Sequence, residues 1–406
     1  MAMIETVTVA AEGPTRIPAN GRVYVPDVDM TVSEMPASGL TSAQQAEVLE
    51  LLRVAFNGGP GWFSLPVAPA DHLQWKLLDF PHHVTAYVME HQDRIIGFAA
   101  RPHRHWLVRG QHRVGLDGVE LALHPDFQGR GLLSSRRSVV FEGDQSDFSL
   151  SFSSHPSSLH SRAARGGRPV ANTLDNLVRP LNVWRYVKPR AAVDARSRTR
   201  MAIEARSQGR PRPLMVRRMG WWARMLRSKM QHPVTRTGKP TWTIRAIDRF
   251  DDRIERFFEQ AATSFDLIQI RDAQFLNWRY VDGRGGPFTV RVAEEGGQIL
   301  GYAVIRASDT VADIADLLAL PGRLDVVHSL VDDAVQIARA AKAPALKTWM
   351  VQSHPYHELL RRHLFLPVRN IVSPGYTVNK IAPSEIEFLD EPGARIHLMI
   401  GDSDHI

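Results

Sequence analysis

The sequence contains two copies of one pattern, and this internal repeat constrains the fold more than any other feature. A His-Leu-Gln-Trp-Lys segment matches a later Phe-Leu-Asn-Trp-Arg segment, and two further matches follow in the same order. The matched segments are 72–76 with 275–279, 95–99 with 299–303, and 154–156 with 353–355. The spacing from Trp75 to Gly97 is one residue shorter than the spacing from Trp278 to Gly301. Three matches in register predict two copies of one fold in tandem.

Length and composition place the chain among globular proteins. A chain of 406 residues allows two or three domains. The absence of cysteine excludes disulfides, cysteine metal sites and a cysteine acyl-enzyme. We find no signal-peptide pattern and no apolar stretch long enough to span a bilayer, and therefore predict a cytoplasmic protein without a membrane span. The net charge of +7 suits an anionic partner.

The distribution of polar and basic residues predicts five segments. They are a flexible N-terminal arm at 1–28, a first domain at 29–188, a basic connector at 189–238, a second domain at 239–382 and a C-terminal tail at 383–406. In the connector, arginines are interleaved with Trp221 and Trp222, a combination that can bind nucleic acid or a membrane surface. A solvated linker is the simpler alternative, and we regard nucleic acid as an unlikely partner.

Within the first domain, the pattern alternates between helices and strands. Thr41 or Ser42 caps a helix with an apolar stripe, and residues 70–78 form a second short helix. Two strands, 84–90 and 94–100, form a hairpin. We therefore predict an α/β protein (an α+β mixed sheet) in each copy.

Residues 114–142 predict a strand, a turn and a helix. Val119–Leu123 is an apolar strand interrupted by Glu120, and a helix follows from Leu132, with Val140 and Phe141 among its apolar positions. Between them, Gln128-Gly129-Arg130-Gly131 leaves amide groups uncovered next to the unpaired N–H groups of a helix start. This arrangement predicts a phosphate or pyrophosphate site. Neither a Walker loop nor a dinucleotide fingerprint is present.

The same stretch resembles the acyl-CoA motif of the GNAT N-acetyltransferase superfamily, Gln/Arg-x-x-Gly-x-Gly/Ala. Gln128, Gly131 and Leu133 fall on its positions, and Leu133 departs from the usual Gly/Ala. The order of strands and helices also matches the GNAT fold. The resemblance implies a tandem GNAT protein that uses acetyl-CoA or another acyl-CoA as cosubstrate. It places the cosubstrate against Leu121, Ala122, Leu123, Gln128, Gly129, Arg130, Gly131, Leu132, Leu133 and Ser134.

Candidate catalytic groups lie on either side of this loop. Glu120 is an acid within an apolar strand, where burial would raise its pKa toward that of a general base, although a solvent-facing position is the alternative. Asp117 is the reserve candidate. GNAT enzymes often use a tyrosine after the fifth strand as general acid; here His160 or Ser161 could take that role. The histidines show no metal-ligand spacing, and we predict no metal.

In the second copy, the turn after Leu320 has one glycine and places Asp325 where a phosphate would bind, so we predict a degenerate domain that completes the substrate groove or dimerises. A homodimer is therefore possible. The predicted function is transfer of an acetyl or other short acyl group to a primary amine of a small molecule such as an aminosugar. Two alternatives stay open: an aminoacyl-tRNA-dependent transferase of the tandem-GNAT type, and a non-catalytic acyl-CoA sensor.

Overall fold

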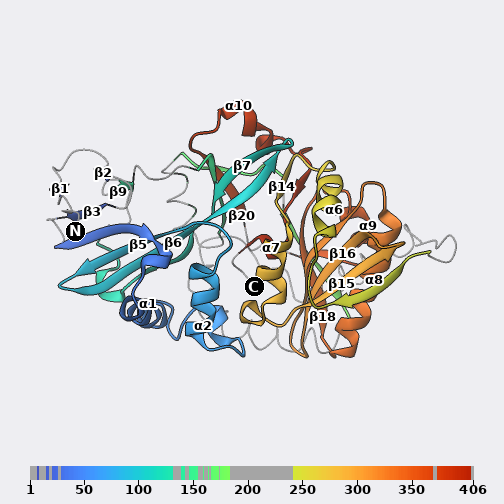
Figure 1. Ribbon diagram of the computed structural model, residues 1–406, viewed down its shortest axis with the longest axis horizontal. Coiled ribbons are helices and arrows are strands. Elements are labelled where there is room, and N and C mark those ends of the chain that lie inside the picture. Colours follow the sequence, from blue (N-terminus) through green and yellow to red (C-terminus); the bar gives the residue numbers. More distant parts are fainter. Residues whose placement is uncertain are drawn as a thin grey trace, which may run out of the picture.

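The computed structural model describes residues 7–8, 15–17, 21–25, 29–130, 139–141, 146–153, 159, 163, 166–172, 174–182, 241–368 and 373–403. These residues form two large mixed sheets with flanking helices, one built mainly from the first half of the chain and one mainly from the second, and a separate pair of short strands (Figure 1). The predicted α/β class with a mixed sheet is confirmed. No helix in these ranges is both long and apolar enough to cross a bilayer. The predicted basic connector lies outside them.

The first sheet has the strand order β1-β3-β4-β5-β6-β7-β10-β20-β11. Its strands are β1 (Val7–Thr8), β3 (Arg22–Val25), β4 (Met30–Pro36), β5 (Val84–His91), β6 (Arg94–Val108), β7 (Gln111–Leu116), β10 (Phe148–Ser153), β11 (Arg168–Pro169) and β20 (Ser373–Val378). The long strand β6 also pairs with β8 (Val119–Leu123) and β14 (Leu267–Gln269), and β14 pairs with β21 (Ile396–His397). β3 lies in the segment predicted as a flexible arm, and its antiparallel pairing with β4 makes residues 22–25 part of the sheet.

Helices of the first half cover this sheet near the hairpin β5–β6. The N-cap of α1 (Ser42–Ala55) is Thr41, one of the two predicted candidates, and Thr41 also forms a capping box with Gln44. Its apolar stripe packs on the sheet through Val48 and Leu52. The second predicted helix consists of α2 (Pro69–Leu73) and the π-helical turn η4 (Gln74–Leu78). Short 3-10 turns complete this half: η2 (Ala37–Gly39), η3 (Gly61–Ser64) and η5 (Pro125–Phe127).

One prediction in this half is wrong. Val140 and Phe141, expected in a helix, lie in the short strand β9 (Val139–Phe141), which pairs in parallel with β2 (Thr15–Ile17). A run of two valines and a phenylalanine favours an extended backbone, because β-branched and aromatic side chains fit a strand better than a helix. Residues 131–138, where the helix was expected to begin, lie outside the described ranges.

The second sheet has the order β13-β15-β16-β17-β18-β12-β19. Its strands are β12 (Leu174–Pro180), β13 (Thr243–Ile247), β15 (Thr289–Glu295), β16 (Gln298–Ala307), β17 (Ala312–Ala319), β18 (Ala345–Val351) and β19 (Leu366–Val368). The helical elements of this half are α6 (Arg253–Ala262), α7 (Ala273–Leu276), η8 (Asn277–Val281), η9 (Gly283–Gly285), α8 (Leu324–Ala340), α9 (His357–Arg362), α10 (Pro383–Ile386), η10 (Glu387–Asp390) and η11 (Ile400–Asp402).

The two sheets repeat one another in detail. Each copy has a π-helical turn at the matched tryptophan, η4 in the first and η8 in the second. Each hairpin then carries the same bulge: Met89 pairs with Gly97 before the register shifts, and Ala293 pairs with Gly301 before it shifts. The internal repeat read from the sequence is thus confirmed at its first two matched segments, whereas residues 154–156 of the third lie outside the described ranges.

Each half also gives strands to the sheet of the other half, β12 from the first half and β14, β20 and β21 from the second. β12 precedes the connector but pairs with β18 and β19 in the second sheet. β20 comes late in the chain but pairs with β10 in the first sheet, where its red ribbon stands among blue-green strands (Figure 1). This exchange joins the halves through backbone hydrogen bonds.

The matched tryptophans meet between the halves. The rings of Trp75 and Trp278 stack with centroids 4.7 Å apart and an interplanar angle of 12°. Trp75 Nε1 donates to the carbonyl of Trp278 (2.8 Å), and Trp278 Nε1 donates to the carbonyl of Trp75 (2.9 Å). Reciprocal contacts between equivalent residues are the mark of a two-fold relation, so the halves are related by a pseudo-two-fold axis at this pair.

Candidate functional site

Two neighbouring strands of the first sheet separate at the place where the sequence predicts the site. β7 and β10 pair in parallel only at Phe148 with Gly115 and Ser149 with Leu116. Beyond that point β10 continues with β20, whereas the chain passes Asp117-Gly118 and continues as β8, which pairs with β6. Among the described residues, no strand pairs with the other edge of β8.

The open edge of β8 offers backbone amides. The N–H of His124 donates to Ile96 of β6, so by the alternation of a strand the N–H groups of Leu123 and Leu121 point to the opposite edge. The side chain of Leu121 is 50% exposed, whereas Ala122 and Leu123 are buried. An unpaired edge of this kind can accept an extended ligand as an additional strand.

The loop that follows is anchored to the end of this strand. Gln128 Nε2 donates to the carbonyl of Leu123 at 2.9 Å. Gly129 has a φ of 76°, a conformation that glycine adopts without strain, and it faces open space. The exposed Arg130 lies with its guanidinium 4.9 Å from the ring centre of Phe127. The loop thus presents amides and a cation. The remaining predicted contacts, Gly131, Leu132, Leu133 and Ser134, lie outside the described ranges.

Glu120 is buried rather than solvent-facing. It is 6% exposed, and its φ of 53° lies in the left-handed region, which is rare for a non-glycine residue within a strand. Its Oε1 accepts a hydrogen bond from Trp62 Nε1 at 2.8 Å and contacts the ammonium of Lys76. Backbone strain of this sort collects at functional sites.

Sequence reasoning missed Lys76. Only 8% of this residue is exposed, and its partner Glu120 is 44 residues further along the chain. The available signal was its place directly after the repeated tryptophan, where the second copy has Arg279. The charge of Glu120 is therefore compensated by a buried cation, a feature that the general-base prediction did not include.

The reserve candidate Asp117 is also paired. Its Oδ2 lies 3.5 Å from Arg104 Nη2, and both side chains are buried. Arg104 reaches the second half through a weak hydrogen bond from Nη1 to Gln269 Oε1 (3.4 Å). A cavity of about 20 Å³ opens beside these residues at the junction of the halves, lined by His72, Lys76, Arg104, Val119, Trp278 and Arg279 among others. The predicted general acids His160 and Ser161 lie outside the described ranges.

The second copy has the same separation of strands, but its open edge is filled. β17 pairs in parallel with β18 only at Ala312 and Asp313, as in the first copy. The hydroxyl of Tyr356 accepts from the N–H of Ala319 (3.0 Å) and lies 3.2 Å from the carbonyl of the same residue. Every residue of β17 is buried, in contrast to Leu121 in β8.

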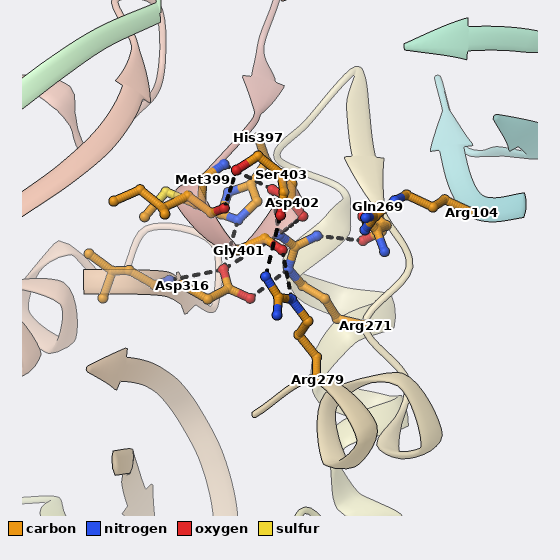
Figure 2. A network of polar contacts seen from close by, with 12 residues as sticks. Arg104, Gln269, Arg271, Arg279, Asp316, His397, Met399, Gly401, Asp402 and Ser403 are labelled. Atoms are coloured by element: carbon orange, nitrogen blue, oxygen red, sulfur yellow. Dashed lines mark hydrogen bonds and ion pairs between the residues drawn. The ribbon is translucent and has the colours of Figure 1, made fainter. Parts of the chain in front are cut away.

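A buried charge network lies within the second half. Figure 2 shows Arg271 between Asp316 and Asp402, with Arg271 Nε 3.0 Å from Asp316 Oδ2 and Nη2 2.7 Å from Asp402 Oδ1. His397 Nε2 lies 3.3 Å from Asp316 Oδ1. Burial alone would raise the pKa of Asp316, but the Arg271 guanidinium and the contact with His397 outweigh it and hold that pKa well below its usual range. The segment 396–403 is thereby fixed inside the fold.

The start of α8, the position in the second copy that corresponds to the predicted phosphate loop, carries its own ion pair. Asp325 lies in the first turn of the helix, and Arg323 Nη2 is 2.9 Å from Asp325 Oδ2. The carboxylate occupies the region of helix N–H groups that would favour an anionic ligand. The strand edge that is open in β8 is thus occupied by the protein itself in the second copy.

Comparison of the sequence with known protein families and with curated proteins finds no match. Solved structures do match. N-myristoyltransferase of Saccharomyces cerevisiae, solved with bound myristoyl-CoA and inhibitors, has a TM-score of 0.51 at 12% identity, covering 86% of this chain and 79% of that one. A probable N-acyltransferase from Enterococcus faecalis V583 has a TM-score of 0.50 at 12% identity, covering 87% and 73%.

A third structure, a tandem GNAT protein from the clavulanic acid biosynthesis pathway, has a TM-score of 0.48 at 13% identity and covers 86% of this chain and 98% of its own. Identities this low establish a shared fold, and the first two structures carry that conclusion. Together with the separated strands found in both sheets, they confirm the predicted architecture. The chain has the fold of the GNAT N-acyltransferases, present twice in tandem.

Proposed function

We propose that the first half binds an acyl-CoA along the open edge of β8 and transfers its acyl group directly to a primary amine. The observation that carries this proposal is the separation of β10 from β8, which leaves strand amides unpaired by any described strand. The pantetheine arm of CoA contains amide groups in an extended chain, so it can pair with such an edge as a strand would. The yeast N-myristoyltransferase, which shares the fold, was solved with myristoyl-CoA bound.

The loop after β8 supplies the second part of the cosubstrate site. The pyrophosphate of CoA would lie against the amides of the Gln128–Arg130 turn and the residues that follow it, with Arg130 providing a positive charge. The hydrogen bond from Gln128 to the carbonyl of Leu123 holds this turn at the end of the strand that would bind the pantetheine. One continuous surface would thus bind both parts of the molecule.

Acyl transfer then requires few steps. The amine nitrogen attacks the thioester carbon, the C–N bond forms, the C–S bond breaks, and the thiolate leaves. Glu120 would accept the proton that the ammonium must lose, held in place by Trp62 and Lys76. His160 or Ser161 would return a proton to the thiolate. The acyl group we propose is acetyl or another short chain, and the acceptor is a small-molecule amine such as an aminosugar.

The test is release of free CoA thiol from acetyl-CoA over a panel of amines, aminosugars included. The wild-type protein should release thiol with at least one amine, and Glu120→Gln should lower the rate by roughly 10² to 10⁴ while leaving acetyl-CoA affinity unchanged. Glu259→Gln, at an exposed position of α6, is the matched control and should keep the full rate. An unaffected rate in Glu120→Gln would remove Glu120 from the mechanism. Binding of acetyl-CoA without thiol release for any amine would favour the sensor.

A further inference from the structure

Three side chains of metal-binding type meet between α8 and the end of α9 in the second half. They are His328, Asp332 and His363, and the ligand atoms that they offer lie within 4.8 Å of one another. His328 Nδ1 is 3.4 Å from Asp332 Oδ2, and His363 Nδ1 is 3.4 Å from Asp332 Oδ1. This cluster is separate in sequence and in fold from the open edge of β8.

The backbone holds these three residues on rigid elements. His328 and Asp332 are one turn apart on α8 and therefore project from the same side of the helix. The opposite side of α8 is fixed by buried apolar residues such as Leu330 and Val331. His363 directly follows α9, and its N–H donates to the carbonyl of Leu359 at 3.0 Å. Sites built on fixed helices hold their ligands with little rearrangement.

His328 gives an independent sign that a ligand is needed here. Both of its ring nitrogens are buried, and neither makes a hydrogen bond in the described part of the chain. Its ring lies edge-on to that of His363, with centroids 4.4 Å apart. A buried polar atom without a hydrogen bond in a native structure calls for an explanation such as a bound ion, and an imidazole nitrogen facing a second imidazole and a carboxylate suits a cation.

The distances agree with a small divalent ion. Metal–nitrogen bonds of about 2.0–2.1 Å in a tetrahedral zinc site place neighbouring ligand atoms about 3.3 Å apart. Each histidine Nδ1 lies 3.4 Å from one carboxylate oxygen of Asp332, His328 from Oδ2 and His363 from Oδ1, and all the ligand atoms lie within 4.8 Å of one another, so a small shift of these side chains gives that spacing. Two imidazoles and a carboxylate favour zinc, cobalt or nickel over calcium or magnesium, which prefer oxygen ligands alone.

We propose that His328, Asp332 and His363 form a divalent metal site, with zinc as its ion, that ties α8 to the end of α9. Three protein ligands leave one position of a tetrahedral ion to water. This site was not predicted from the spacing of the histidines, since His328 and Asp332 are close in the chain but His363 is brought to them by the fold.

The test is a titration of the metal-stripped full-length protein with Zn²⁺ by calorimetry, repeated with Co²⁺ by visible absorption. We expect one high-affinity Zn²⁺ site per chain, and a visible Co²⁺ spectrum of tetrahedral type. His328→Ala and Asp332→Asn should each weaken Zn²⁺ binding at least about tenfold. Zn²⁺ should raise the melting temperature of the wild-type protein and leave that of Asp332→Asn unchanged.

The matched control comes from a second group of histidines on β6, β7 and the segment before β5. The rings of His82 and His105 stack at 3.8 Å, and His112 lies 4.9 Å from His105. His112→Ala should keep full Zn²⁺ affinity. The proposal is overturned by unchanged affinity in both His328→Ala and Asp332→Asn, or by loss of the site in His112→Ala. Asp332 is partly exposed (side chain 32%), so its asparagine variant tests the proposal even if His328→Ala fails to fold.

Discussion

The buried ion pair of Lys76 and Glu120 allows the effect of its removal on the free energy of unfolding to be predicted. Glu120 is 6% and Lys76 8% exposed. Removing one partner of a buried ion pair costs about 3–5 kcal/mol of unfolding free energy, because the other charge stays buried without compensation. Glu120→Gln keeps an oxygen that can accept from Trp62, so we expect a cost near the lower end, about 3 kcal/mol.

The double variant separates charge pairing from packing. Lys76→Met should cost about 3–5 kcal/mol, since it leaves the Glu120 carboxylate buried beside an apolar side chain. Combining Lys76→Met with Glu120→Gln removes both charges, and replacing a whole buried pair is often close to neutral. The double variant should therefore be more stable than either single variant, within about 2 kcal/mol of the wild-type protein.

The assay is urea unfolding of the four proteins, followed by tryptophan fluorescence and far-ultraviolet circular dichroism. Coincident transitions are needed before free energies are compared, because two-domain proteins can unfold in steps. If the cost of the double variant equals the sum of the single costs, the two side chains are not coupled and the reasoning is refuted.

Three further predictions use the same unfolding measurement. Trp278→Ala should cost about 3–5 kcal/mol, whereas Trp278→Phe, which loses mainly the hydrogen bond to Trp75, should cost about 1 kcal/mol; equal costs would contradict the stacked arrangement. Arg271→Met should cost at least about 3 kcal/mol because it leaves two buried carboxylates uncompensated; a neutral effect would contradict the network of Figure 2. Burial lowers the pKa of both His354 and His397, so the stability that these neutral rings contribute is present above about pH 6.5 and lost as the pH falls below it; a flat profile between pH 7 and pH 5 would contradict their burial.

The sequence was sufficient where local chemistry decides structure. The helix N-cap at Thr41 and the hairpin of β5 and β6 follow from short-range patterns, and the structure confirms both. The repeat around Trp75 and Trp278 predicted equivalent positions correctly, because the spacing of its matched segments differs by only one residue between the copies.

Contacts between residues that are far apart in the sequence could not be predicted in the same way. The apolar pattern of β12 predicts a strand but not the sheet that the strand joins. Backbone hydrogen bonds between strands do not depend on residue type, so the sequence does not specify the partner strand. The partner of Glu120 is set by the packing of η4 against β8, which brings Lys76 to it. The filling of the second copy depends on Tyr356 and the segment 396–403, whose roles follow only from the assembled fold.

The measurement that tests the central claim most directly is calorimetric titration of the protein with acetyl-CoA. We predict one site per chain, because the edge equivalent to β8 is filled in the second copy. Arg130→Glu, at an exposed position of the loop, should weaken binding at least about tenfold by placing a carboxylate near the pyrophosphate. Arg256→Glu, exposed on α6, should bind as the wild-type protein does. Two sites per chain, no binding, or equal affinity in Arg130→Glu and Arg256→Glu would contradict the location of the cosubstrate proposed here.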